Sequence, residues 1–413
     1  MIYVKIQITN LSAMILHFIE APIHQLNKNV YSRIKIMEFI AFNVQFDISF
    51  IILEEIEIKK YFPIKHLNNN EINLIIENQI KQLELLKKEE HLGNIKEKIK
   101  EKQSEMLTLA SYQSNKIIKK IIETNDNLKN KFVFATKTIK LWAKNNYIYD
   151  NQFGFLNGST INLIVLKLVL IYFDSSMLYL LEKDWRVPIK LKELTVKSQS
   201  WSLESEIKIK KELYLKKAIN NEEIIRLEKH VNTIMGVLTP SYPEQNSSYN
   251  VNYSTLKIIR KEIKNGLKIF NDTKNKSGVN EEIKEAWKIW INGLNFLKKY
   301  KHYLLILCLS NENKSKESIN YCRFVESRIR LELLFTIEQN QEQIKYIHST
   351  NKEKCLPNKI NEKYGEHYIQ HWWIGIEINN NYINHLSFDN NEINNLNLFI
   401  DNIRKNTPFI FGN

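Results

Sequence analysis

The sequence predicts an α+β protein of several domains. Its 413 residues suffice for two to three domains. Strict alternation over residues 43–50 predicts a half-buried strand, whereas helical periodicity prevails from about residue 70 to 290. Farther on, strand-like runs at 303–309 and 372–378 flank a predicted helix at 325–337. The order of these patterns predicts three domains, at 1–130, 131–290 and 291–413.

The alternating segment has an apolar face and a polar face. Its apolar positions are Val44, Phe46, Ile48 and Phe50, and its polar positions are Asn43, Gln45, Asp47 and Ser49. Asp47 is therefore a carboxylate in mid-strand, flanked by strong strand formers. Such a residue either is exposed on an open sheet or lines a cleft, and the spacing alone leaves both alternatives open.

The charge balance favours a polyanionic partner. The formal net charge is +13 and the sequence pI is about 9.2. RNA, a nucleotide and an acidic membrane are all compatible with that balance. The high Ile, Asn, Lys and Glu content is also typical of a drift in codon usage, which raises the lysine count without any such partner.

Cysteine usage and hydropathy restrict the setting of the protein. Cys308, Cys322 and Cys355 fit no zinc-binding spacing, and their odd number argues against a disulfide framework, which favours a reducing compartment. The N-terminus lacks a basic region followed by a small-residue cleavage site. Charged residues interrupt the apolar run Ile161–Leu181, so it predicts a buried helix and no membrane span.

A helix predicted over Phe134–Lys144 has two different sides. Phe134, Ala135, Thr138, Ile139 and Trp142 form one side, and Lys137, Lys140 and Lys144 form the other. A basic face of this kind either is simply solvated or binds an anion.

The segment from Leu238 to Thr255, LTPSYPEQNSSYNVNYST, escapes the general compositional bias. Its two prolines exclude a helix interior or a central strand. It predicts an ordered loop, stapled by tyrosines and by Asn and Ser side chains bonded to the local backbone. A helix follows, with Ser254 as its expected N-cap. The apolar positions of that helix are Leu256, Ile259, Ile263, Leu267 and Phe270.

The loop pattern TPxYPxxNSxYNVxxST resembles a loop of eukaryotic poly(A) polymerases. Further blocks resemble the same family in the same order, namely IKLWAKNNYIYDNQFGFLNGS, WRVPIKL, FLKKYKHYLLIL and FVESRIRLEL. The resemblance covers most of the chain from about Arg33. It implies the remnant of a nucleotidyltransferase palm sheet in 1–130, with a charged helical insertion. It also implies a helical middle domain and a C-terminal RRM-like RNA-binding domain.

The resemblance also implies roles for individual residues. VQFDISF is similar to the strand that bears the family's third metal-binding aspartate, which makes Asp47 a catalytic residue and metal ligand. Lys140 corresponds to the lysine that contacts the ATP phosphates, and Tyr149 to a nucleotide-contacting tyrosine. Asn151 matches an asparagine that helps to recognise adenine. Gly158 and Ser159 lie in the turn that closes on the nucleotide.

The activity implied by the family is the addition of adenylates from ATP to the 3′ end of pre-mRNA. Two divalent metals, Mg²⁺ or Mn²⁺, would activate the 3′ hydroxyl and steady the leaving pyrophosphate. The expected partners are an RNA 3′ end, ATP and cleavage or polyadenylation factors, with no membrane. The expected location is the nucleus.

The departures from the family pattern affect the catalytic centre. The family's Gly-Ser turn and its Asp-x-Asp strand are not found before Asp47, and a single aspartate cannot hold two Mg²⁺ ions. The family's Ser-Leu-Asn-Gly loop corresponds to Ser111–Ser114, and its Gly-Gly pair corresponds to Asn157 and Gly158. No RNP1 motif with paired aromatics is visible. The chain is therefore expected to lack an N-terminal part of the catalytic domain and to be weak or inactive alone.

Three interpretations of the function follow from these matches and departures. The first is a poly(A) polymerase, in which Asp47 projects into one groove with Lys140 and Tyr149. The second is a catalytically dead relative that binds RNA or proteins. A helical scaffold unrelated to RNA is the third alternative, which the colinear blocks disfavour.

Overall fold

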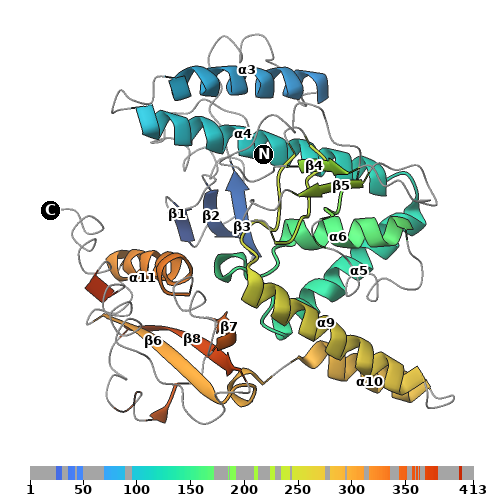
Figure 1. Ribbon diagram of the computed structural model, residues 1–413, viewed down its shortest axis with the longest axis vertical. Helices are drawn as coiled ribbons and strands as arrows, with labels where there is room; N and C mark the ends of the chain where they lie inside the picture. The colour runs from blue at the N-terminus through green and yellow to red at the C-terminus, as the bar shows by residue number, and fades with distance from the viewer. Residues whose placement is uncertain are drawn as a thin grey trace. The chain divides into compact units, whose positions relative to one another are not determined.

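The described residues of the computed structural model fall into two compact units, each considered by itself below. One comprises Met1–Asp126, Leu191–Ile207 and Thr239–Gln245, and the other Asn127–Lys190, Lys208–Leu238 and Asn246–Asn413. Both units combine helices with small antiparallel sheets (Figure 1), which confirms the predicted α+β, multidomain class. The structure describes residues 25–29, 36–41, 44–49, 69–88, 95–171, 185, 187–191, 209–212, 224–227, 234–241, 244–274, 280–293, 295–310, 316–334, 344–350, 356–358, 360, 362, 368–379 and 400–401.

The first unit contains a three-stranded antiparallel sheet. Its strands are β1 (Gln25–Asn29), β2 (Ile36–Ala41) and β3 (Val44–Ser49), in that spatial order. The strand predicted around Asp47 is confirmed as β3. The register pairs Asp47 with Glu38 of β2, which places two acidic residues at facing positions of the sheet.

Two long helices, α3 (Asn69–Lys88) and α4 (Ile95–Ile122), pack against each other in the same unit. The resemblance implied a loop at Ser111–Ser114, but these residues lie inside α4. The reason is local, because α4 contains neither glycine nor proline to interrupt the helix. Gln113 is buried there, and its Nε2 donates to Asn73 Oδ1 of α3 at 2.6 Å.

The second unit opens with a helical region formed by α5 (Asp126–Asn145), α6 (Gly158–Ile171), α9 (Tyr253–Lys274) and α10 (Asn280–Asn292). It also holds a two-stranded sheet of β4 (Ile209–Glu212) and β5 (Ile224–Leu227). The apolar run predicted as a buried helix begins within α6, while its residues 172–181 lie outside the described part. None of the helices that the structure describes is long and apolar enough to cross a membrane.

Helix α5 contains the predicted helix, but only part of its predicted apolar side is buried. Phe134, placed on the apolar side by its spacing, has 67% of its surface exposed. The buried residues of α5 are Phe132, Thr136, Trp142 and Ala143. Trp142 stacks on Trp290 of α10, with ring centroids 5.6 Å apart. Packing against α10 therefore decides which side chains of α5 are buried, and the pattern within α5 did not specify this.

Asn and Ser side chains hold the loop before α9, as the sequence predicted. Asn246 Oδ1 accepts from the Val237 amide at 3.0 Å, and Asn246 Nδ2 donates to the Met235 carbonyl at 3.0 Å. Ser248 Oγ donates to the same carbonyl at 2.8 Å. These bonds add to backbone pairs such as that of the Ser247 amide with the Val237 carbonyl at 2.8 Å, and they satisfy polar groups that regular structure would otherwise pair.

The N-cap of α9 is Asn252, so the prediction of Ser254 was wrong. Asn252 Oδ1 accepts from the Thr255 amide at 2.8 Å, and Thr255 Oγ1 accepts from the Asn252 amide at 2.9 Å. This reciprocal pair is a capping box, which satisfies two amides at once. Ser254 instead accepts from the Ile347 amide at 3.3 Å, a tertiary contact that local sequence does not reveal.

The last part of the second unit is a small α+β region. Its antiparallel sheet has the order β6 (His302–Ser310), β8 (Tyr368–Ile378), β7 (Ile344–Thr350). The predicted helix appears as α11 (Lys316–Arg328), continued by the π-helical turn η4 (Ile329–Leu334). Strand β7 was not predicted, because its side chains are buried on both faces and do not alternate.

Candidate nucleotide site and the domain junction beside it

Helix α5 ends in a left-handed turn at Tyr147. The Ile148 amide donates to the Ala143 carbonyl at 2.9 Å and the Tyr147 amide to the Lys144 carbonyl at 3.2 Å, which is the Schellman pattern. Tyr147 has a φ of 58°, a conformation that glycine usually supplies. Such backbone strain persists only where surrounding contacts impose it.

The next turn is fixed from two directions. Asp150 Oδ1 accepts from the Gln152 amide at 3.1 Å and so caps the short 3₁₀ helix η2 (Asn151–Phe153). Asn250 Nδ2, from the loop before α9, donates to the Asn151 carbonyl at 2.9 Å. Gly154 ends the turn at a φ of 84°, where an added Cβ would lie 2.8 Å from the Asn250 carbonyl oxygen.

Asn157 then caps helix α6. Its Oδ1 accepts from the Thr160 amide at 2.8 Å, while its Nδ2 donates to the Ser247 carbonyl at 2.7 Å. Gly158 and Ser159 are the first two residues of the helix, and Ser159 is exposed. The N-terminus of α6 thus has a partial positive charge and backbone amides directed outward.

Three of the residues singled out in the sequence converge at this helix start. A Cβ added to Gly158 would lie 3.2 Å from Tyr149 Oη and 3.7 Å from Lys140 Nζ. Lys144 Nζ lies 5.5 Å from the centre of the Tyr149 ring. Asn151 also contacts the N-terminus of α6, because the Nδ2 of its cap residue Asn157 donates to Asn151 Oδ1 at 3.3 Å. Residues 140 to 159 therefore form one continuous candidate site.

The electrostatics of this site suit an anion. Burial lowers the pKa of Lys140, and the nearby ammonium of Lys144 lowers it further. Burial raises the pKa of Tyr149, which keeps its hydroxyl neutral and able to donate. Among the residues that the structure describes, no carboxylate is paired with Lys140. Two ammonium groups and a helix N-terminus thus add positive potential at one place.

Asp47 belongs to the other unit, so the prediction that it shares a groove with Lys140 and Tyr149 stays a prediction. Its strand position and its pairing with Glu38 are defined, whereas its side chain lies outside what the structure describes. Within the described ranges no group of three or more His, Cys, Asp or Glu residues could hold a metal ion. The role of Asp47 as a metal ligand therefore stays a prediction.

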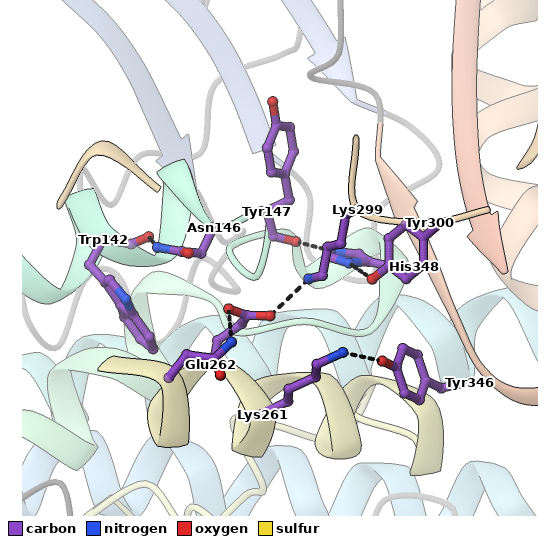
Figure 2. Close-up of polar contacts among 10 residues, drawn as sticks. Trp142, Asn146, Tyr147, Lys261, Glu262, Lys299, Tyr300, Tyr346 and His348 are labelled. Atoms are coloured by element: carbon purple, nitrogen blue, oxygen red, sulfur yellow. Dashed lines mark hydrogen bonds and ion pairs between the residues drawn. The ribbon is translucent and has the colours of Figure 1, made fainter. Parts of the chain in front are cut away.

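Beside the site, the helical region joins the C-terminal sheet through a buried polar network (Figure 2). Lys299 Nζ lies 2.8 Å from Glu262 Oε1 of α9, with only 9% and 2% of the two side chains exposed. His348 of β7 bridges two further groups. Its Nε2 donates to the Tyr147 carbonyl at 2.8 Å, and its Nδ1 is 2.7 Å from Tyr300 Oη.

The geometry fixes the protonation pattern of this bridge. A carbonyl oxygen only accepts, so Nε2 of His348 carries the proton, and in the neutral ring Nδ1 accepts from the Tyr300 hydroxyl. The bridge holds the carbonyl of the strained residue Tyr147, two positions before Tyr149. The C-terminal sheet therefore supports the turn that presents Tyr149.

Sequence reasoning missed Glu262, Lys299 and His348. One signal was present, because Glu262 is the single acidic residue among the basic ones between residues 253 and 271 of α9 and falls at helical spacing from Ile259. Burial lowers the pKa of Lys299 more than Glu262 raises it, as expected for an ammonium that has lost most of its water. No local pattern identified the partner of either residue.

Comparison with known proteins agrees with this architecture. A family model described as "Poly(A) polymerase central domain" matches residues 131–286, and one described as "Poly(A) polymerase predicted RNA binding domain" matches residues 295–363. Together they cover more than half of the chain. The chain is similar to "Poly(A) polymerase PAPa" of Candida albicans, at 26% identity over 208 residues. That stretch is 48% of this chain and 33% of the relative. These matches, in this order along the chain, show that the protein belongs to the poly(A) polymerase family.

Proposed function

We propose that the protein acts in adding adenylates from ATP to the 3′ end of pre-mRNA, with residues 140–159 as its nucleotide site. The observation that carries this proposal is the convergence of Lys140 Nζ and Tyr149 Oη on Gly158 at the start of α6. A triphosphate needs cations and backbone amides held in advance, and both are found there. Family membership supports ATP as the ligand over other anions.

Each residue has a distinct part in this proposal. Lys140 binds the phosphates, with Lys144 adding to the positive potential. Gly158 lets the phosphates approach the backbone, and the adjacent Ser159 offers its amide and hydroxyl. Tyr149 donates a hydrogen bond to the nucleotide, while the neighbouring turn with Asn151 contacts adenine.

Further parts of the proposal concern the metal, the partners and the location. Mg²⁺ or Mn²⁺ is the proposed metal, with Asp47 as one ligand. No step of the reaction is derived through this metal. RNA is the proposed partner of the region that matches the RNA-binding model. Cleavage and polyadenylation factors as partners, and the nucleus as location, follow from family membership alone.

The first test is ATP binding by the 413-residue protein, measured by calorimetry with Lys140→Ala and Lys137→Ala. Lys137 lies on the same helix and is exposed, so it is a matched control. Loss of a charge-assisted contact should weaken binding about tenfold to a hundredfold for Lys140→Ala and by less than about twofold for Lys137→Ala. Equal affinities for the two variants would contradict the site.

The second test separates the enzyme from a catalytically dead relative. The protein is incubated with an oligo(A) primer, ATP and Mg²⁺ or Mn²⁺, and primer extension is followed on a gel. Extension that Asp47→Ala abolishes supports the enzyme. Binding of ATP and RNA without extension supports the dead relative.

A further inference from the structure

Helix α9 presents an exposed ridge with charge of one sign. Its members share one face of the helix, at spacings of three and four residues, and are Tyr253, Lys257, Arg260, Lys261, Lys264 and Lys268. Between residues 253 and 271 the helix contains a single acidic residue, Glu262, which is buried against Lys299. Every exposed charge over that length is therefore positive. The ridge extends for about 22 Å.

The neighbouring helix α10 shows that this arrangement is not a general property of exposed helices here. Its exposed charges alternate in sign, and Lys288 pairs with Glu285 at 3.2 Å. Like charges at three- and four-residue spacing repel one another and destabilise a helix. The ridge on α9 therefore lowers helix stability, a cost that an anionic partner would offset.

The ridge is connected at one end to both neighbouring regions. Lys257 Nζ donates to the Lys345 carbonyl at 3.3 Å, so the ridge adjoins strand β7 of the region that matches the RNA-binding model. Thr255, the third residue of α9, has its Cγ2 atom 3.4 Å from a Cβ added to Gly154. The N-terminal end of the ridge thus abuts the turn of the proposed nucleotide site.

We propose that this ridge binds the backbone of single-stranded RNA whose 3′ end lies at the nucleotide site, an inference that rests on the proposed function. Regularly spaced cations follow a phosphate chain, and Tyr253, with 61% of its surface exposed, offers a ring for a base to stack on. An acidic membrane fits less well. Interfacial helices expose apolar side chains beside their cations, but Ile258, Ile259 and Ile263 of α9 are at most 4% exposed.

The test measures binding of a labelled oligo(A) of about 15 nucleotides by fluorescence anisotropy, between about 50 and 200 mM salt. The ridge variant Lys264→Gln with Lys268→Gln is compared with Lys284→Gln and Lys288→Gln on α10, which removes the same charge. The ridge variant should bind about tenfold more weakly, and its slope of log affinity against log salt should fall by about 1.4. The α10 variant should match the wild type.

The outcomes distinguish this inference from the proposed function. A wild-type protein that fails to bind oligo(A) would refute the RNA-binding part of the proposed function, and the ridge with it. A wild type that binds, with a ridge variant of equal affinity and slope, would overturn the ridge alone. An equal loss in the α10 variant would also overturn it, since net charge would then suffice.

Two further measurements sharpen the assignment. Tyr253→Ala should weaken binding about tenfold without changing the salt slope, and Tyr253→Phe should retain affinity, because stacking needs the ring and not the hydroxyl. Loss of binding to phosphatidylserine vesicles in the ridge variant, with RNA binding unchanged, would replace RNA by a membrane. Unaltered ATP binding shows that the ridge variant is folded.

Discussion

Two lysines in the second unit lie near tyrosines but differ in what neutralises them. Lys299 is buried, and its charge is met by Glu262 at 2.8 Å within the protein. Lys140 is half-buried beside Tyr149, with Lys144 as its charged neighbour and no carboxylate paired with it in the described part of the chain. The first charge is balanced on folding, whereas we propose that the phosphates of a nucleotide balance the second.

The comparison separates structural from functional charge by physical criteria. A buried ammonium without a carboxylate would destabilise the fold. The pairing of Lys299 with Glu262 is therefore needed for folding, whatever the protein binds. A half-buried cation at a helix N-terminus is tolerated because water still reaches it, and it attracts anions. The junction accordingly stabilises the fold, and the neighbouring turn is the proposed binding site.

The largest expected effect is on the junction. Glu262→Ala leaves Lys299 buried and unpaired, so the free energy of unfolding should fall by about 3–5 kcal/mol. The matched control is Glu285→Ala, whose partner Lys288 is exposed and whose loss should cost at most about 1 kcal/mol. Denaturant unfolding measures both variants. A loss no larger than that of the control would remove the distinction between the two kinds of lysine.

His348→Ala comes next in size. It leaves the Tyr147 carbonyl and the Tyr300 hydroxyl without their partner and creates a cavity, which should cost about 2–4 kcal/mol. Tyr300→Phe removes one of these bonds and should cost about 1 kcal/mol. ATP affinity should also fall for His348→Ala, because the Tyr147 turn loses its support. A destabilised variant with unchanged ATP affinity would show that junction and site are independent.

Gly158→Ala tests the nucleotide site without altering the contacts of Glu262, Lys299 and His348. The added Cβ would lie 3.2 Å from Tyr149 Oη and take the space proposed for the phosphates. ATP affinity should fall about tenfold, a loss of about 1.4 kcal/mol. The melting temperature should stay equal or rise slightly, because alanine favours the helix more than glycine does. A fall in both quantities would instead indicate a structural role for Gly158.

The smallest effect concerns pH. Burial and Lys144 lower the pKa of Lys140 below its ordinary 10.5, so its positive charge is complete below the lowered pKa and is lost as pH rises through it. ATP affinity should therefore decline in the alkaline range at a pH below 10.5. Lys144→Ala removes one cause of the lowering, so that decline should move to higher pH. Lys137→Ala should leave the profile unchanged, and a profile unaffected by Lys144→Ala would contradict the coupling.

Local patterns predicted the elements better than their faces. The strand around Asp47 and the helix following the loop were found because alternation and helical spacing are visible within a few residues. Asn252 and Ser254 are both good capping residues, and the pattern did not show that β7 engages Ser254. Phe134 was placed inward because nothing within α5 shows where α10 packs.

The sequence by itself determined the α+β class, the order of the elements and the family, and it brought Lys140, Tyr149 and Gly158 to notice within one short stretch. Only the tertiary structure decided that Glu262 meets Lys299, 37 residues away, and that His348 holds a carbonyl 201 residues away. The physical reason is the sequence distance over which each interaction acts. Helix, strand and cap preferences act over about four residues, whereas a buried charge or carbonyl is satisfied by whichever group the folded chain brings to it.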